Sequence, residues 1–372
     1  MDVKKQVSEY SSCVVTPVFV DIGNSFISGC LYDRHGHKIE ESERFGGFHG
    51  DHFFSQNETF IKIEADIETR FGNSIYLGHY MPHYGHFITE TLSTFWYLVE
   101  NRDVKFDWYV FHEFSMGNKL TEAFLVCLDV FRIPMEKVVI VGSENKIFVC
   151  DKMIVPSRLW KLNHSVNIAT KITYDFIAEN IRNCSSESEL LYSGKKIYLS
   201  RLRQSMKTAN RIVANEYIIE RIFESYGFEV VYPESLSFRN QVLLYSSAST
   251  IAGASGSALH NCLFMRSGSV VIELLDPRYN KPAPNQDICL RASSANSHFY
   301  SKLAISVLDS AIFWYDTKEM KCFLSSIFPD VRRTGYDFNF RILSGELKFE
   351  TLFFLRFVRK YLGKLIKKIR IL

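Results

Sequence analysis

Paired cysteines and long apolar runs are both missing from this chain of 372 residues. None of the eight cysteines forms a CxxC pair, which excludes the usual zinc sites and a small disulfide scaffold. No window reaches ~18–20 uninterrupted apolar residues, so no segment is predicted to span a bilayer. The first residues, MDVKKQVSEYSSC, lack the apolar core of a signal peptide. We therefore expect a cytoplasmic protein whose cysteines are reduced and buried.

Net positive charge is absent from the body of the chain and concentrated at one end. The 44 Lys and Arg and 41 Asp and Glu give a net charge of +3. Residues 351–372 contain seven basic residues and no acid, which leaves −4 for residues 1–350. A slightly acidic body lacks the clustered basic surface that phosphate backbones require, so no nucleic-acid partner is expected.

The basic end has a helical pattern of apolar residues. They recur every three or four positions at Leu355, Val358, Leu362, Leu365, Ile369 and Leu372. This pattern predicts a basic amphipathic helix over 345–372 that lies on an anionic membrane surface. The alternative is a C-terminal helix that docks on the protein through its apolar stripe.

The second half of the chain alternates strands and helices. Strands are predicted at 195–200, 228–233, 249–254 and 269–276, with helices at 216–226, 238–247 and just after 256. Asn215 is predicted to cap the first of these helices and Gly227 to end it. Strands that alternate with helices indicate a parallel sheet covered on both faces.

The first half shows a similar but less regular pattern. Strands are predicted at 13–20, 26–33, 73–80, 105–112, 137–142 and 146–150, and helices at 85–100 and 118–131. We therefore predict an α/β fold of two Rossmann-like, doubly wound domains that face a cleft. Their predicted ranges are 1–165 and 166–340, before the helix over 345–372.

A glycine turn, GASGSALHN, joins a buried strand to a helix. Gly253 and Gly256 permit close backbone approach, while Ser255 and Ser257 add hydroxyl donors. The start of a helix attracts anions, so this turn is a candidate site for a diphosphate. Small residues also occur at such turns merely for helix–sheet packing.

Charged residues follow the strands at the same predicted edge. Arg201 and Arg211 supply forked donors that can bind phosphate without a metal, although solvated loop charges are the alternative. Glu273, near the end of the last strand, is a candidate for binding ribose hydroxyls; otherwise it serves in capping or pairing with Arg278.

Three histidines and a glutamate occur together in HYMPHYGHFITE. His79, His83 and His86 invite a metal interpretation, but Pro82 breaks a continuous helix and no DxD motif completes a site. We therefore predict no metal. His86 and Glu90 are one helical turn apart, which favours a general base assisted by a carboxylate. A histidine in a capping network is the alternative.

Several ordered blocks resemble one enzyme family. KKIYLSR, RIVANE, GFEVVYPESLSFRNQV and STIAGASGSALHNCLFMRSGSVVIEL, together with GHFITETLSTFWYL upstream, are similar to glycosyltransferase family 61, the DUF563 group. Members resemble inverting transferases with two Rossmann-like domains (the GT-B fold) that use nucleotide sugars. The resemblance covers roughly residues 75–275.

The resemblance implies site residues block by block. Those on the donor side are Arg201, Arg211, Gly253, Ser255, Gly256, Ser257, His260, Asn261 and Glu273; His86 and Glu90 come from the upstream block. Many members have a histidine where this chain has Ser255. Because of that departure, His260 in the next turn is a candidate for the role of the missing histidine. The alternative is that the protein is a non-catalytic scaffold that binds a glycan or a nucleotide.

The resemblance implies sugar transfer with inversion and without a metal or other cofactor. The expected partners are a nucleotide-diphosphate sugar, an oligosaccharide or lipid-linked glycan acceptor, and an anionic membrane surface. We expect a peripheral enzyme on the inner face of the plasma membrane, in bacterial capsule, lipopolysaccharide or exopolysaccharide biosynthesis. A nucleotide-sugar epimerase is disfavoured because no GxGxxG turn follows the first strand.

Overall fold

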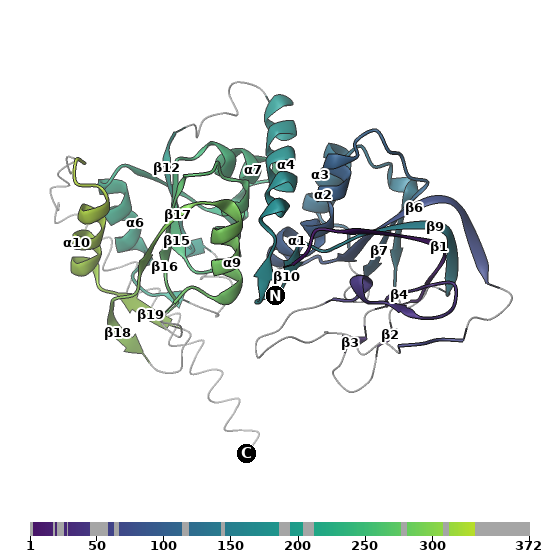
Figure 1. Cartoon of the computed structure of the whole chain (residues 1–372). Helices are drawn as coiled ribbons and strands as arrows, with labels where there is room; N and C mark the ends of the chain where they lie inside the picture. Colours follow the sequence, from purple (N-terminus) through teal and green to yellow (C-terminus); the bar gives the residue numbers. More distant parts are fainter. Residues whose placement is uncertain are drawn as a thin grey trace, which may run out of the picture.

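The computed structural model shows two large sheets with helices packed between them, and three smaller sheets of two or three strands (Figure 1). It describes residues 3–17, 19–20, 26–27, 29–44, 59–62, 67–113, 119–142, 146–185, 194–203, 212–276, 281–307 and 312–331. Arg211, Arg278 and the basic amphipathic helix predicted over 345–372 lie outside the described residues.

The N-terminal sheet has seven strands and is mixed rather than parallel. In spatial order it contains β5 (Lys38–Ile39), β4 (Leu31–Tyr32), β1 (Val7–Val15), β9 (Phe148–Pro156), β6 (Glu68–Tyr80), β7 (Trp108–Glu113) and β8 (Val138–Val141). The last four are parallel, whereas β1, β4 and β5 join in antiparallel fashion. The prediction of a doubly wound domain is therefore not confirmed for this half. Only the four strands from β6 onward are parallel, and among the described residues no helix connects β8 to β9.

The C-terminal sheet has five strands and is parallel throughout. Its order is β14 (Phe228–Val231), β12 (Lys196–Leu199), β15 (Thr250–Ala254), β16 (Val270–Leu274) and β17 (Asn296–Tyr300). Every residue of the central β15 is buried, as expected for a strand that is covered on both faces. The chain reverses its direction of strand addition between β12 and β15, and binding sites are usual at the carboxyl ends of such strands.

Smaller strands and the helices complete the fold. The other strands are β2 (Phe19–Val20), β3 (Phe26–Ile27), β10 (Trp160–Lys161), β11 (Ser165–Val166), β13 (Ile212–Val213), β18 (Leu303–Val307) and β19 (Ile312–Tyr315). The helices are α1 (Tyr84–Thr89), α2 (Trp96–Glu100), α3 (Glu122–Val130), α4 (Lys171–Asn183), α6 (Glu216–Ser225), α7 (Phe238–Ser247), α8 (Ser257–His260), α9 (Pro284–Ser293) and α10 (Thr317–Ile327). Side-chain caps start several of them: the Thr121 and Ser237 hydroxyls accept the Phe124 and Asn240 amides at α3 and α7.

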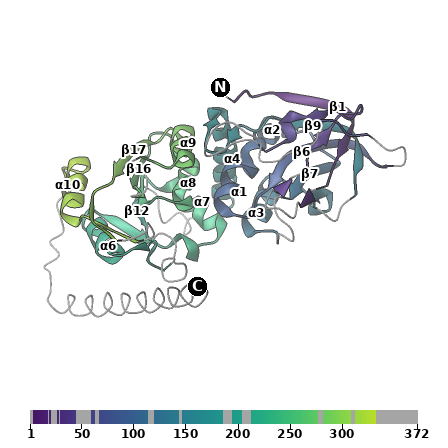
Figure 2. The ribbon, with the colours of Figure 1, turned by 90° about the horizontal axis from the view of Figure 1, so that it is seen from below.

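One hydrophobic core joins the two halves. Figure 2 shows α1, α4, α7 and α8 between the sheets, and the core there contains Phe87 and Phe124 as well as Phe238 and Leu259. Polar contacts cross the same junction. The Trp160 indole donates to Asn285 Oδ1 over 3.0 Å, and Glu122 Oε1 accepts the Phe238 amide over 3.2 Å. The halves therefore meet through packed helices.

Most predicted elements of the second half are confirmed, and α7 has the predicted limits of 238 and 247. In the first half, the prediction of one continuous helix over 85–100 is wrong. The segment is divided into α1, a 3-10 turn (Thr91–Thr94) and α2. The cap predicted at Asn215 is also wrong, because its amide side chain bonds the Tyr315 backbone instead of the helix.

The cysteines agree with the prediction in part. All eight are free thiols and six are buried, but Cys184 and Cys322 are exposed. Among the described residues, no helix combines the length and the apolar character that crossing a membrane requires.

Candidate active site

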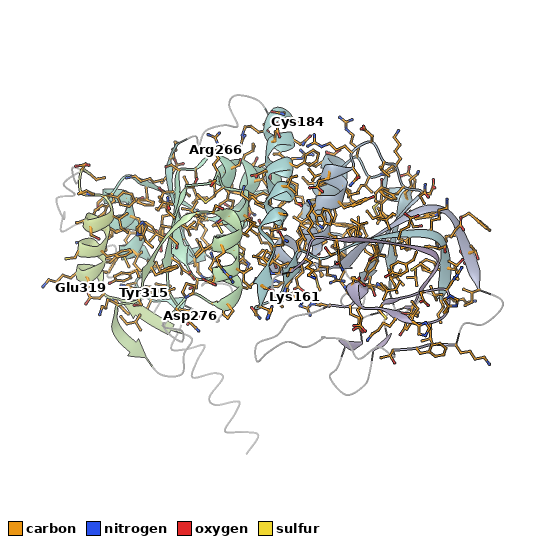
Figure 3. All side chains as sticks on the ribbon, in the orientation of Figure 1. Lys161, Cys184, Arg266, Asp276, Tyr315 and Glu319 are labelled. Atoms are coloured by element: carbon orange, nitrogen blue, oxygen red, sulfur yellow. The ribbon has the colours of Figure 1, made fainter. Side chains whose placement is uncertain are left out.

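The two switch points of the sheets supply the candidate site. In the C-terminal sheet, Arg201 follows β12 and Gly256 follows β15. In the N-terminal sheet, the segment after β6 carries α1, and Arg158 follows β9. Figure 3 labels Asp276 and Tyr315 at the carboxyl edge of the C-terminal sheet, whereas Arg266 lies at the opposite edge. The predicted donor residues that the structure describes therefore lie around one edge of their sheet.

Arg201 packs directly on the glycine turn. A side-chain carbon added at Gly256 would lie 2.7 Å from an Arg201 terminal nitrogen, so a larger residue there would require the guanidinium to move. Glu216 fixes the Arg201 backbone, since its Oε1 accepts the Arg201 amide over 2.9 Å and the Tyr198 hydroxyl over 3.0 Å. Burial raises the pKa of Glu216 to about 7. The structure thus brings Arg201 and Gly256 together as predicted from their strand-end positions.

The glycine turn faces α1 of the other half. A side-chain carbon at Gly85 would lie 3.0 Å from Ser257 Cβ and 3.3 Å from His260 Nδ1. Beside this contact the Tyr84 hydroxyl lies 2.7 Å from Asn261 Oδ1. A side chain at Gly85 would therefore require Ser257 and His260 to move by a few tenths of an ångström. The contact places the helix that carries His86 against the helix that follows the glycine turn.

His86, Glu90 and Arg44 form a hydrogen-bonded chain. His86 Nδ1 lies 2.5 Å from Glu90 Oε1, and Arg44 donates to both Glu90 oxygens over 2.6 and 2.9 Å. Burial alone would raise the pKa of Glu90, but the hydrogen bond from His86 and the charge of Arg44 outweigh it and lower the pKa to about 2. The His86 side chain is 37% exposed, whereas that of Glu90 is 4% exposed. A buried carboxylate thus orients an imidazole that faces solvent.

Three predicted donor-side residues have their side chains engaged within the protein. The Ser255 hydroxyl donates to Glu273 Oε1 over 2.6 Å and accepts the Asp276 amide over 3.0 Å. Burial raises the pKa of Glu273 to about 7. Asn261 is buried and donates to the Ala258 carbonyl. Ser255 and Glu273 thus form bonds within the protein at the strand ends, where the sequence predicted contacts with a ligand.

The three neighbouring histidines do not converge. His79 is buried and contacts Arg158, while the His83 ring lies 5.2 Å from that of His86. Within the part of the chain that the structure describes, no three His, Cys, Asp or Glu side chains group as a metal site. The remaining predicted contacts, Gly253 and Ser257, lie on the glycine turn, and Gly253 packs on the Leu199 carbonyl.

Sequence reasoning missed Arg44, Arg158 and Gly85. Arg44 comes from a segment 46 residues before its partner Glu90, and no local pattern connects them. Arg158 carried a usable signal, because it follows the carboxyl end of a strand that pairs with β6. Gly85 lies next to His86 and gave no sign of the contact that it makes.

Comparison with known proteins identifies the family. No curated protein matches the chain. The family model described as Glycosyltransferase 61 matches residues 84–272, just over half of the chain. That range starts at α1, includes His86 and Glu90, and ends within β16. The chain therefore belongs to glycosyltransferase family 61.

Proposed function

We propose that this protein is an inverting, metal-independent glycosyltransferase of the GT-B type that moves a sugar from a nucleotide-diphosphate donor to a glycan acceptor. The observation that carries the proposal is the contact of Gly85 with Ser257 and His260. Through it the helix of His86 and the glycine turn beside Arg201 become parts of one site, within a family of sugar transferases.

The donor binds in the C-terminal half through its diphosphate. Arg201 and the glycine-turn segment from Gly253 to Ser257 supply positive charge and donors at the switch point of that sheet. As the glycosidic phosphate bond breaks, negative charge grows on the leaving diphosphate. A guanidinium fixed nearby stabilises that charge without a metal ion.

His86 acts as the base. It removes the proton from the acceptor hydroxyl as that oxygen attacks the sugar carbon from the face opposite the diphosphate. Glu90 is held ionised by Arg44 and stabilises the imidazolium that forms. His86 is half exposed, as a residue that receives an acceptor from solvent must be. His260 is the second candidate for this role, because it lies against the same helix.

A panel of nucleotide sugars tests the donor half of the proposal. Thermal-shift measurements with and without divalent cations should show stabilisation by one nucleotide sugar, independent of the cation. Arg201→Ala should weaken that binding at least about tenfold, the loss of one charged phosphate contact. Arg266→Ala, at the opposite edge of the sheet (Figure 3), should leave it unchanged. Unchanged affinity in Arg201→Ala contradicts the donor assignment.

A membrane role is proposed for the basic segment 351–372, whose seven positive charges favour an anionic surface. With it we propose a peripheral location on the inner face of the plasma membrane and a role in bacterial surface-polysaccharide synthesis. Deletion of residues 351–372 should release the protein from vesicles of anionic lipid. Continued binding by the deletion variant contradicts this part of the proposal.

A non-catalytic nucleotide- or glycan-binding scaffold is the second candidate. One observation favours it: Ser255 replaces a histidine common in the family and is engaged by Glu273. The His86–Glu90–Arg44 chain argues for catalysis, because a scaffold has no use for an oriented imidazole. Detectable sugar transfer or donor hydrolysis excludes the scaffold.

A further inference from the structure

Arg158 carries a positive charge that no carboxylate of the described residues pairs with. It lies just after β9, beside the end of β6. One terminal nitrogen donates to the Ser42 carbonyl over 2.9 Å and to His79 Nδ1 over 2.5 Å. Nearby Arg44, by contrast, is neutralised by Glu90. The cluster of Arg44, Arg158 and Glu90 therefore has one positive charge in excess.

The contact with Arg158 fixes the state of His79. Because a guanidinium only donates, His79 Nδ1 accepts, and a neutral ring then has its proton on Nε2. His79 is 1% exposed, and its Nε2 has no hydrogen-bond partner among the described residues. Arg158 Nε also has no hydrogen-bond partner among the described residues. Two buried donors without acceptors are costly. Solvent reaches neither atom, so an anion that bonds them must enter beside the partly exposed guanidinium of Arg158.

The backbone is shaped to hold this pair. The ladder between β6 and β7 shifts register between Tyr76 and His79, a bulge that re-aims the His79 side chain. Gly78 in the bulge has φ +81°, a conformation that favours glycine. A side-chain carbon there would lie 3.4 Å from Arg158 Cζ, so the guanidinium rests on the glycine backbone. Arg158 itself is partly exposed, so a ligand can approach it.

We propose that Arg158 and His79 bind an oxyanion of the acceptor, so that the preferred acceptor is an acidic glycan bearing a carboxylate or a phosphate. The cluster adjoins the base: Glu90 bonds His86 and acts electrostatically on Arg158. An acceptor anchored at Arg158 would thus lie close to the carboxylate that orients His86. The identity of the ligand as an acceptor rests on the proposed function, whereas oxyanion binding at Arg158 does not.

Binding of three small probes tests the site. Dissociation constants are measured by ligand-observed NMR for methyl glucoside, methyl glucuronide and glucose 6-phosphate, which separate a carboxylate from a phosphate. We expect one of the two acidic sugars to bind at least about tenfold more tightly than the neutral one, since only a charged group forms charge-assisted hydrogen bonds with the guanidinium. Arg158→Gln should abolish that preference. Arg158→Lys keeps the charge without the planar fork and should retain part of it.

Two controls separate the possible failures. Arg266→Gln removes an exposed arginine from the far edge and should keep the full preference. Affinity for the nucleotide sugar should be the same in Arg158→Gln and the wild type. If the wild type shows no preference for an acidic sugar, or if Arg158→Gln keeps that preference, the inference is overturned. The proposed function is not affected by either result. A tenfold loss of nucleotide affinity in Arg158→Gln also overturns the inference, because the anion is then the donor diphosphate.

Discussion

At the scale of single residues, Glu90 has the clearest electrostatic role. It is buried, accepts hydrogen bonds from Arg44 and His86, and stays ionised because these contacts outweigh the cost of burial. Its pKa of about 2 lies below the ordinary value near 4.5. The ionised form therefore stabilises the fold above pH ~4.5, and this contribution is lost as the pH falls toward 2.

Glu90→Gln should thus lower the free energy of unfolding by about 3 kcal/mol at pH 7, the equivalent of this pKa shift. Urea unfolding at pH 7 and at pH 3 checks the prediction. The difference in the free energy of unfolding between variant and wild type should be smaller at pH 3 than at pH 7. A difference that is independent of pH between 7 and 3 contradicts the role of His86 and Arg44 in keeping Glu90 ionised.

The pKa of Glu273 shifts in the direction opposite to that of Glu90. Burial raises its pKa to about 7, so the folded protein favours the protonated form. Its contribution is most favourable below pH ~4.5 and is lost as the pH rises through 7. Glu273→Gln should therefore gain stability relative to the wild type between pH 5 and 8, by up to about 3 kcal/mol. Thermal melts across this range measure the gain; a constant difference argues that Glu273 does not titrate there.

At the scale of elements, the contact between α1 and α8 joins the two halves of the site. Gly85→Ala adds a carbon 3.0 Å from Ser257 Cβ, so its neighbours must move by a few tenths of an ångström. Alanine raises helix propensity, yet we expect a net loss of about 1–3 kcal/mol from overpacking. Removing the opposing carbon in the double variant Gly85→Ala, Ser257→Gly should restore part of the loss. Stabilisation by Gly85→Ala alone contradicts the close contact.

The elements also show what the sequence can predict. The strands β12, β14, β15 and β16 were predicted because each is a short apolar run between turn residues. The break in the helix over 85–100 was not predicted. There the Thr91 hydroxyl accepts the Met81 amide, a contact that no helical period reveals. Arg44 and Arg158 were not predicted as site residues for the same reason. Their partners are distant in sequence and meet only in the folded sheet.

At the scale of the whole molecule, the two sheets share one core. Aromatic contacts cross the junction, with the Phe87 and Phe238 rings 6.3 Å apart. We therefore expect the two halves to unfold together, in a single calorimetric transition whose measured and van't Hoff enthalpies agree. Two separate transitions would show that the halves are stable alone and that the shared core contributes little.

The central claim is that His86, oriented by Glu90, is the base for sugar transfer, and the rate of transfer with a saturating donor tests it most directly. His86→Gln should lower kcat by about 10²–10⁴-fold, the usual contribution of a general base, with nucleotide affinity unchanged. His35→Gln, at an exposed histidine, should transfer at the wild-type rate. Full activity in His86→Gln, together with loss of transfer in His260→Gln, would move the base to the other side of the site and contradict the account.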